Sequence, residues 1–73
     1  MTKVLFRKDS WGVTACFPED MSCYSRIGQH STYSRDWYRQ TRPASPEEYR
    51  ALKRELESYP YEYQLEIIHR HPR

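Results

Sequence analysis

PASPEEYRALKRELESYP, residues 43–60, is the stretch that decides the fold class. Ser45 is placed as a helix N-cap, Pro46 fits the first helical position, and Glu48 completes an S-x-x-E capping box that satisfies otherwise unpaired backbone amides. Four apolar residues follow at spacings of three, four and three and form one stripe: Tyr49, Leu52, Leu56 and Tyr59. Pro60 ends the pattern. The stretch predicts one amphipathic helix that packs against another element.

The amino-terminal residues 3–17 predict a β-hairpin. Side chains alternate in character in TKVLFRK, residues 2–8, and again in GVTACFP, residues 12–18, which is the period of a strand with two different faces. Between them DSWG, residues 9–12, supplies turn chemistry. One face collects Val4, Phe6, Val13, Ala15 and Phe17, and the other collects Lys3, Leu5, Arg7, Thr14 and Cys16.

Three further segments are expected to complete the sheet. MSCYSRI, residues 21–27, alternates and is closed by Gly28, and DWYRQT, residues 36–41, is assigned as a fourth strand that pairs back on it. The intervening GQHSTYS, residues 28–34, is small and polar and is expected to be an exposed loop. YEYQLEIIHR, residues 61–70, alternates well and predicts the last strand.

These elements predict a single α+β domain over residues 1–73. A small antiparallel sheet of about four to five strands, in the order ββββαβ, is expected to pack against one helix in two layers. The expected core consists of Val4, Phe6, Val13, Ala15, Phe17, Leu52, Leu56, Leu65 and Ile67. The other face of the sheet is left open to solvent.

Composition narrows the classes of function. The 12 basic and 10 acidic residues nearly balance, and the net charge of +2 is too small to argue for DNA or membrane binding. The chain lacks the apolar run of a signal peptide or a membrane span, so a cytoplasmic protein is expected. Two cysteines are too few for a secreted disulfide scaffold, and Cys16 and Cys23 are expected to be free and partly buried.

Two catalytic or metal-binding interpretations fail on spacing and context. Potential zinc ligands exist, but they do not form the close pairs typical of structural zinc sites: Cys16, Cys23, His30, His69 and His71. A nucleophile with His30, drawn from the cysteines or from Ser31 with Asp36, lacks a rigid turn and a deep pocket. We therefore expect no enzymatic activity, no catalytic or metal-binding residue and no cofactor.

The excess positive charge lies in the arginine- and tyrosine-rich segment 24–42, where four arginines stand against Asp36. Its candidate binding residues are Arg26, Tyr33, Arg35, Trp37, Tyr38, Arg39 and Arg42. Tyrosine, tryptophan and arginine mark protein-interaction hot spots, which favours a protein partner. Nucleic acid or a nucleotide is the alternative, because guanidinium groups bind phosphates and aromatic rings stack on bases. A further alternative is that these residues bind no partner and that the arginines only cover the open face of the sheet. No membrane partner is expected, and the oligomeric state is left open.

The sequence also resembles a known group of proteins. The stretch CYSRIGQHSTYSRDWYRQTRPASPEEYRALKRELES, residues 23–58, together with MTKVLFRK and VTACFP, resembles short uncharacterised proteins of bacteroidete gut bacteria and their phages and mobile elements. GQH and the TRPASPEEY start of the helix are its most specific portions. The resemblance implies no activity, cofactor or catalytic residue. It implies an accessory factor that binds a host or phage component.

Overall fold

The computed structural model describes residues 1–26 and 29–72, and it has an α+β fold. Its elements, in chain order, are β1 Thr2–Asp9, β2 Gly12–Phe17, β3 Ser22–Tyr24, β4 His30–Thr32, α1 Arg35–Arg39, β5 Arg42–Pro43, α2 Pro46–Glu57 and β6 Leu65–Ile67. The strands pair in the order β4-β3-β2-β1-β5, and β6 also pairs with β1. The α+β class predicted from the sequence is confirmed, with α1 and β5 as additions to the expected order.

The amino-terminal hairpin forms as predicted. β1 pairs antiparallel with β2 from Leu5 opposite Cys16 to Asp9 opposite Gly12. The Asp9 carboxylate accepts hydrogen bonds from the backbone amides of Trp11 (2.8 Å) and Gly12 (3.1 Å), which fixes the turn. Gly12 has φ +137°, a conformation that favours glycine.

Helix α2 also forms where the sequence predicts it. The Ser45 hydroxyl accepts from the Glu48 amide at 3.3 Å, and the Glu48 carboxylate accepts from the Ser45 amide at 2.9 Å. This is the predicted capping box. Leu52 and Leu56 are buried, whereas Tyr59 lies beyond the end of the helix and is 86% exposed. Its assignment to the apolar stripe was therefore wrong.

The region between the third strand and α2 departs from prediction. The third strand, β3, is shorter than the predicted strand over residues 21–27. Ile27, predicted to end that strand, and Gly28, predicted to close it, lie outside the described residues. The fourth strand is β4, inside the segment expected to be a loop. Of the residues 36–41 assigned to that strand, 36–39 lie in helix α1. The reason is local, because the Ser34 hydroxyl accepts from the Trp37 amide at 3.1 Å and caps the helix, and Asp36 lies in its first turn.

The carboxyl-terminal strand is also shorter than predicted. Only β6 is strand within residues 61–70, and it runs parallel to β1, with Thr2 opposite Leu65 and Val4 opposite Ile67. β5 occupies the other end of the same edge of β1, where Arg7 lies opposite Pro43. Two short strands thus share one edge of β1, which leaves no room for a ten-residue partner.

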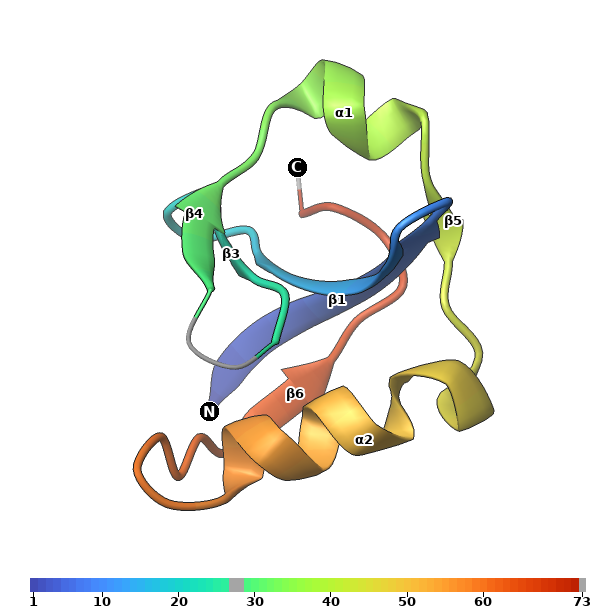
Figure 1. Cartoon of the computed structure of the whole chain (residues 1–73). Coiled ribbons are helices and arrows are strands. Elements are labelled where there is room, and N and C mark those ends of the chain that lie inside the picture. Colours follow the sequence, from blue (N-terminus) through green and yellow to red (C-terminus); the bar gives the residue numbers. More distant parts are fainter. Residues whose placement is uncertain (27–28, 73) are drawn as a thin grey trace.

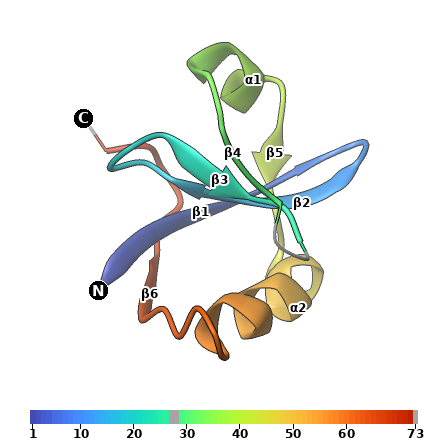
Figure 2. The same cartoon turned by 60° about the vertical axis from the view of Figure 1, so that its left-hand side comes forward.

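Both faces of the sheet are covered. The fold therefore has three layers, where the sequence predicted two. Figures 1 and 2 show α2 on one side of the sheet, with α1 and the carboxyl terminus on the other. The α2 side contains all nine expected core residues and, in addition, the fully buried Tyr24. The Tyr24 hydroxyl donates to the Glu55 carboxylate of α2. The opposite face, expected to be open, carries a second cluster of Leu5, Cys16, Cys23 and Tyr33, against which Met21, Trp37, Tyr38 and Ile68 pack.

Candidate functional site

A hollow of about 900 Å³ opens beside α1, on the face of the sheet opposite α2. Three large aromatic side chains line it, Trp11, Tyr33 and Trp37, which we call the aromatic wall. Polar residues with hydroxyl or amide side chains line the rest, together with Asp9, Gly12, Val13, Cys23 and Arg26: Thr14, Ser25, Gln29, Ser31, Thr32 and Ser34. The combination of apolar surface with a few polar groups and one cation is typical of a binding site.

Trp37 reaches the hollow because α1 is held close to the sheet. Arg7 of β1 is buried, and its guanidinium donates to the Thr41 hydroxyl (2.8 Å) and to the Thr41 carbonyl (2.6 Å), just after the helix. Its Cζ atom also lies 4.1 Å from the centre of the Tyr38 ring. Arg7 thus joins the strand to the carboxyl end of α1, where carbonyl groups favour a cation.

His71, near the carboxyl terminus, contacts Tyr33 of the aromatic wall and the neighbouring Tyr38. The Tyr33 hydroxyl lies 2.8 Å from His71 Nε2, and the His71 ring meets the Tyr38 ring edge-on at 5.2 Å. Burial raises the pKa of Tyr33, so this phenol stays protonated. Burial, and then the nearby Arg35 guanidinium, lower the pKa of His71 below its ordinary value of 6.5. A neutral imidazole therefore stands behind Tyr33 at neutral pH.

Trp11 is the residue that sequence reasoning missed. It lies in the two-residue turn of the first hairpin and is 95% exposed, although a tryptophan gains more than most side chains from burial. The Asp9 carboxylate holds the turn, so the ring is presented from an ordered backbone. A large aromatic residue inside DSWG, where turn chemistry forces exposure, was the signal available in the sequence.

The structure brings together only some of the predicted binding residues. Arg26, Tyr33 and Trp37 line the hollow, and Tyr38 packs behind it. Arg35 is exposed at the start of α1, and its charge acts on Tyr33 and His71.

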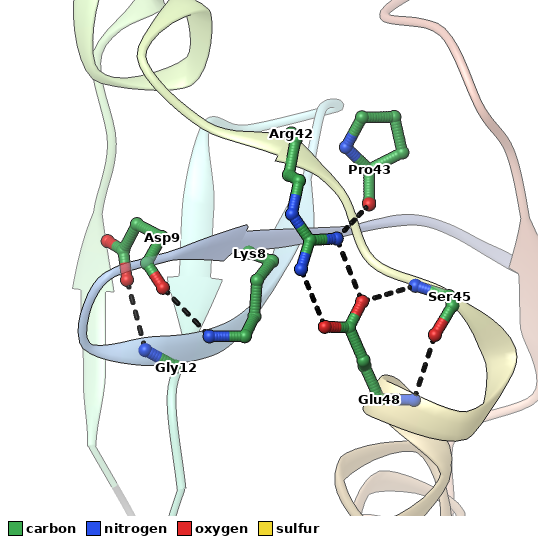
Figure 3. A network of polar contacts seen from close by, with 7 residues as sticks. All are labelled: Lys8, Asp9, Gly12, Arg42, Pro43, Ser45 and Glu48. Carbon is green, nitrogen blue, oxygen red and sulfur yellow. Dashed lines mark hydrogen bonds and ion pairs between the residues drawn. The ribbon is translucent and has the colours of Figure 1, made fainter.

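Two of the four arginines are instead committed to carboxylates. Arg39 pairs with Asp36 at 3.1 Å on the exposed side of α1. Arg42 binds Glu48 through both nitrogens, at 2.7 and 2.9 Å, beside the cap of α2 (Figure 3). This hydrogen bonding is the main reason that the pKa of Glu48 falls to about 2. Within residues 1–26 and 29–72, neither Arg26 nor Arg35 has an ion pair.

One edge of the sheet adjoins the hollow and pairs with no further strand among the described residues. β4 is the last strand in the pairing order, and Ser31 and Thr32 line the hollow. The Ser25 amide bonds the Gln29 carbonyl, and the Tyr33 amide bonds the Met21 carbonyl, each at 3.0 Å. Bonded and non-bonded pairs alternate in an antiparallel ladder. The backbone groups of Ser31 therefore face β3, and those of His30 and Thr32 face outward, which we call the free edge.

Comparison with known proteins adds nothing to this geometry. No family model, curated protein or solved structure matches the chain. The site must therefore be interpreted from its own chemistry.

The described part of the chain carries neither a helix suited to span a membrane nor a cluster of metal-binding side chains. None of its helices has both the length and the apolar character needed to cross a bilayer. It also holds no group of three or more histidine, cysteine, aspartate or glutamate side chains placed to bind a metal ion.

Proposed function

We propose that the protein is a small non-enzymatic binding module that docks an extended segment of a partner protein. The segment lies along the free edge and places side chains in the hollow. The observation that carries this proposal is the coincidence, on one surface, of three features: the aromatic wall, an arginine with no ion pair to any described residue, and a strand edge with outward-facing backbone groups. Strand addition obtains affinity from backbone hydrogen bonds and specificity from pockets for alternate side chains.

Charge supports an acidic segment as the occupant. Arg26 is exposed in the wall of the hollow and has no carboxylate partner within the described ranges. Asp9 is the one acid among the described residues of the lining, and its carboxylate accepts hydrogen bonds from two backbone amides of the turn. A carboxylate of the partner could accept a charge-assisted hydrogen bond from the Arg26 guanidinium. Apolar side chains next to that carboxylate could pack on the aromatic wall.

A random peptide library displayed on phage tests the proposal. Wild-type protein should enrich peptides that combine an aspartate or glutamate with aromatic or branched apolar residues. Arg26→Glu should weaken binding of an enriched peptide by at least about tenfold, since a hydrogen bond to a charged group contributes about 1.5–3 kcal/mol. Trp37→Ala should weaken it by a similar factor, because it removes an aromatic hot-spot residue. Arg50→Glu is the matched control, because Arg50 is exposed on α2, on the other side of the sheet. Failure to enrich any peptide, or equal binding by all variants, would contradict the proposal.

A nucleotide or single-stranded nucleic acid is the second candidate. The observation in its favour is that Trp37, Arg26 and five serine or threonine side chains line one hollow, which suits a stacked base with a phosphate beside it. Arg39 and Arg42 are absent from the lining of this hollow, and this favours the protein partner, because the described residues offer no continuous arginine track for a nucleic-acid backbone. Binding of oligonucleotides or cyclic nucleotides that falls steeply with salt would favour this second candidate, since a protein hot spot changes far less.

The resemblance to short proteins of bacteroidete bacteria and their phages supports a cellular context for the proposal. We infer an accessory factor of a phage or mobile element that acts in the cytoplasm on a host or phage protein. Expression in a bacteroidete host, followed by cross-linking from a photoreactive residue at position 37, would test this context. Loss of the cross-linked product in an Arg26→Glu background is the expected result.

A further inference from the structure

The two cysteines lie directly opposite each other on neighbouring strands. Cys16 of β2 and Cys23 of β3 are Cα partners in the antiparallel register. Both thiols are free, both are buried, and both belong to the cluster under α1. Two side chains at partnered positions point to the same face of a sheet, so the sulfur atoms face the same layer.

The hydrogen-bond pattern identifies the type of this pair. The bonds from Ser25 to Gln29 and from Tyr33 to Met21 direct the backbone groups of residues 21, 23 and 25 toward β4. Cys23 therefore has no backbone bond to β2, and Cys16–Cys23 is a non-hydrogen-bonded pair. The Cα atoms of such pairs lie about 4.5 Å apart, inside the range of about 4.4–6.8 Å that a disulfide spans.

We propose that Cys16 and Cys23 form a reversible cross-strand disulfide within the native fold. The inference does not depend on the proposed function, since it rests on strand register alone. It assigns a redox modification site to the layer directly under α1.

Access and size suggest the order of events. Cys23 lines the hollow, whereas Cys16 is fully buried. Glutathione disulfide is the natural class of oxidant: the Cys23 thiolate attacks one of its sulfurs and releases one glutathione thiolate, which leaves glutathione attached to Cys23. The hollow offers room for that group, and Arg26 in its wall attracts glutathione carboxylates.

The second step consumes the mixed disulfide. The Cys16 thiolate attacks Cys23 Sγ, forms the cross-strand bond and releases the second glutathione. Overall the two protein thiols are oxidised, one glutathione disulfide becomes two glutathione molecules, and the two thiol protons end on them. Burial, and then the neighbouring Cys23, raise the pKa of Cys16 to about 12, and burial raises that of Cys23. The exchange is therefore expected to be slow at neutral pH and faster in mild alkali.

The test is a redox titration of the purified full chain against mixtures of glutathione and glutathione disulfide, followed by mass spectrometry. Equilibrium is approached from both the reduced and the oxidised protein, in buffer and in concentrated urea. The wild-type monomer should lose the mass of two hydrogens. The Cys16→Ser variant should stop at one attached glutathione, and the Cys23→Ser variant should react much more slowly.

The comparison between folded and unfolded protein decides the proposal. The glutathione ratio that half-oxidises the chain should favour the disulfide at least about tenfold more in the native protein than in urea, because a disulfide with matching geometry stabilises the fold. An equal or weaker tendency in the native protein would overturn the proposal. So would a native chain that keeps both thiols, or one whose product is a disulfide between two molecules.

Discussion

Replacing Arg7 with methionine tests how the layer that carries the aromatic wall is held. The side chain is only 8% exposed, and it donates to the Thr41 hydroxyl, the Thr41 carbonyl and, at 3.4 Å, the Tyr38 carbonyl. The methionine side chain is similar in length to that of arginine but is apolar. It therefore fills the same space without making the hydrogen bonds. The variant therefore isolates the polar contribution of the arginine.

The expected magnitude follows from the contacts. A hydrogen bond to a charged group contributes about 1.5–3 kcal/mol, and the contact with the Tyr38 ring adds about 0.5–2 kcal/mol. Desolvation of the guanidinium offsets much of this sum, because removing an ion from water costs several kcal/mol. The substitution also leaves the Thr41 carbonyl without the donor it has in the native protein. We expect Arg7→Met to lower the free energy of unfolding by about 2–3 kcal/mol.

Urea unfolding followed by tryptophan fluorescence is the assay. A Trp11→Phe background leaves Trp37 as the only tryptophan, so the signal reports on α1. Arg7→Lys keeps the charge but cannot match the guanidinium contacts with Thr41, and it should retain less than half of the stabilisation. Lys3→Met, on the same strand and face, should change stability by less than about 0.5 kcal/mol. Equal stability of Arg7→Met and wild type, or full rescue by lysine, would refute this account of α1.

Three further outcomes are expected. Leu56→Ala should cost about 2–5 kcal/mol in urea unfolding, since this side chain is fully buried under the sheet, and a smaller loss would mean that the α2 layer is loosely packed. Glu48→Gln should lower the melting temperature by a few degrees at neutral pH, because it breaks the bidentate contact with Arg42. The difference in melting temperature between this variant and wild type should vanish as acid protonates the native carboxylate near its pKa of about 2. Burial and then Arg35 lower the pKa of His71 below 6.5, so the unfolded chain binds a proton at His71 more tightly than the folded chain does. The melting temperature should therefore fall as the pH is lowered from about 7.5 to about 5.5, and it should fall less in the His71→Ala variant. Parallel pH profiles of the two proteins would exclude His71 as the cause.

Local signals in the sequence were sufficient for the hairpin and for α2. Alternation placed Val4 and Leu5 on opposite faces, and the Ser45 capping box located the helix start, because both signals act over a few residues. Helix α1 was missed because five residues are too few to display a helical period. Its available signal was Ser34 three residues before Trp37, which is N-cap spacing.

The candidate site was only partly predictable for a different reason. The excess of arginine pointed to Arg26, which lines the hollow, but composition does not show which arginines have partners. Arg42 pairs with Glu48 only because β5 runs directly into the cap of α2, as Figure 3 shows. The approach of Trp11 to the hollow likewise depends on how the hairpin lies against β3 and β4. Contacts that depend on how elements are placed in space leave no periodic pattern in a single sequence.

The most direct test of the central proposal is an NMR titration of isotopically labelled protein with a library-selected acidic peptide. Shifts should concentrate on the Trp37 indole and on the Arg26 side chain, and the backbone amides of His30 and Thr32 should exchange more slowly with solvent. A peptide methylated on the backbone nitrogens that pair with the free edge should bind at least about tenfold more weakly. Shifts confined to α2, or unchanged exchange at His30 and Thr32 with undiminished binding of the methylated peptide, would contradict docking at the hollow.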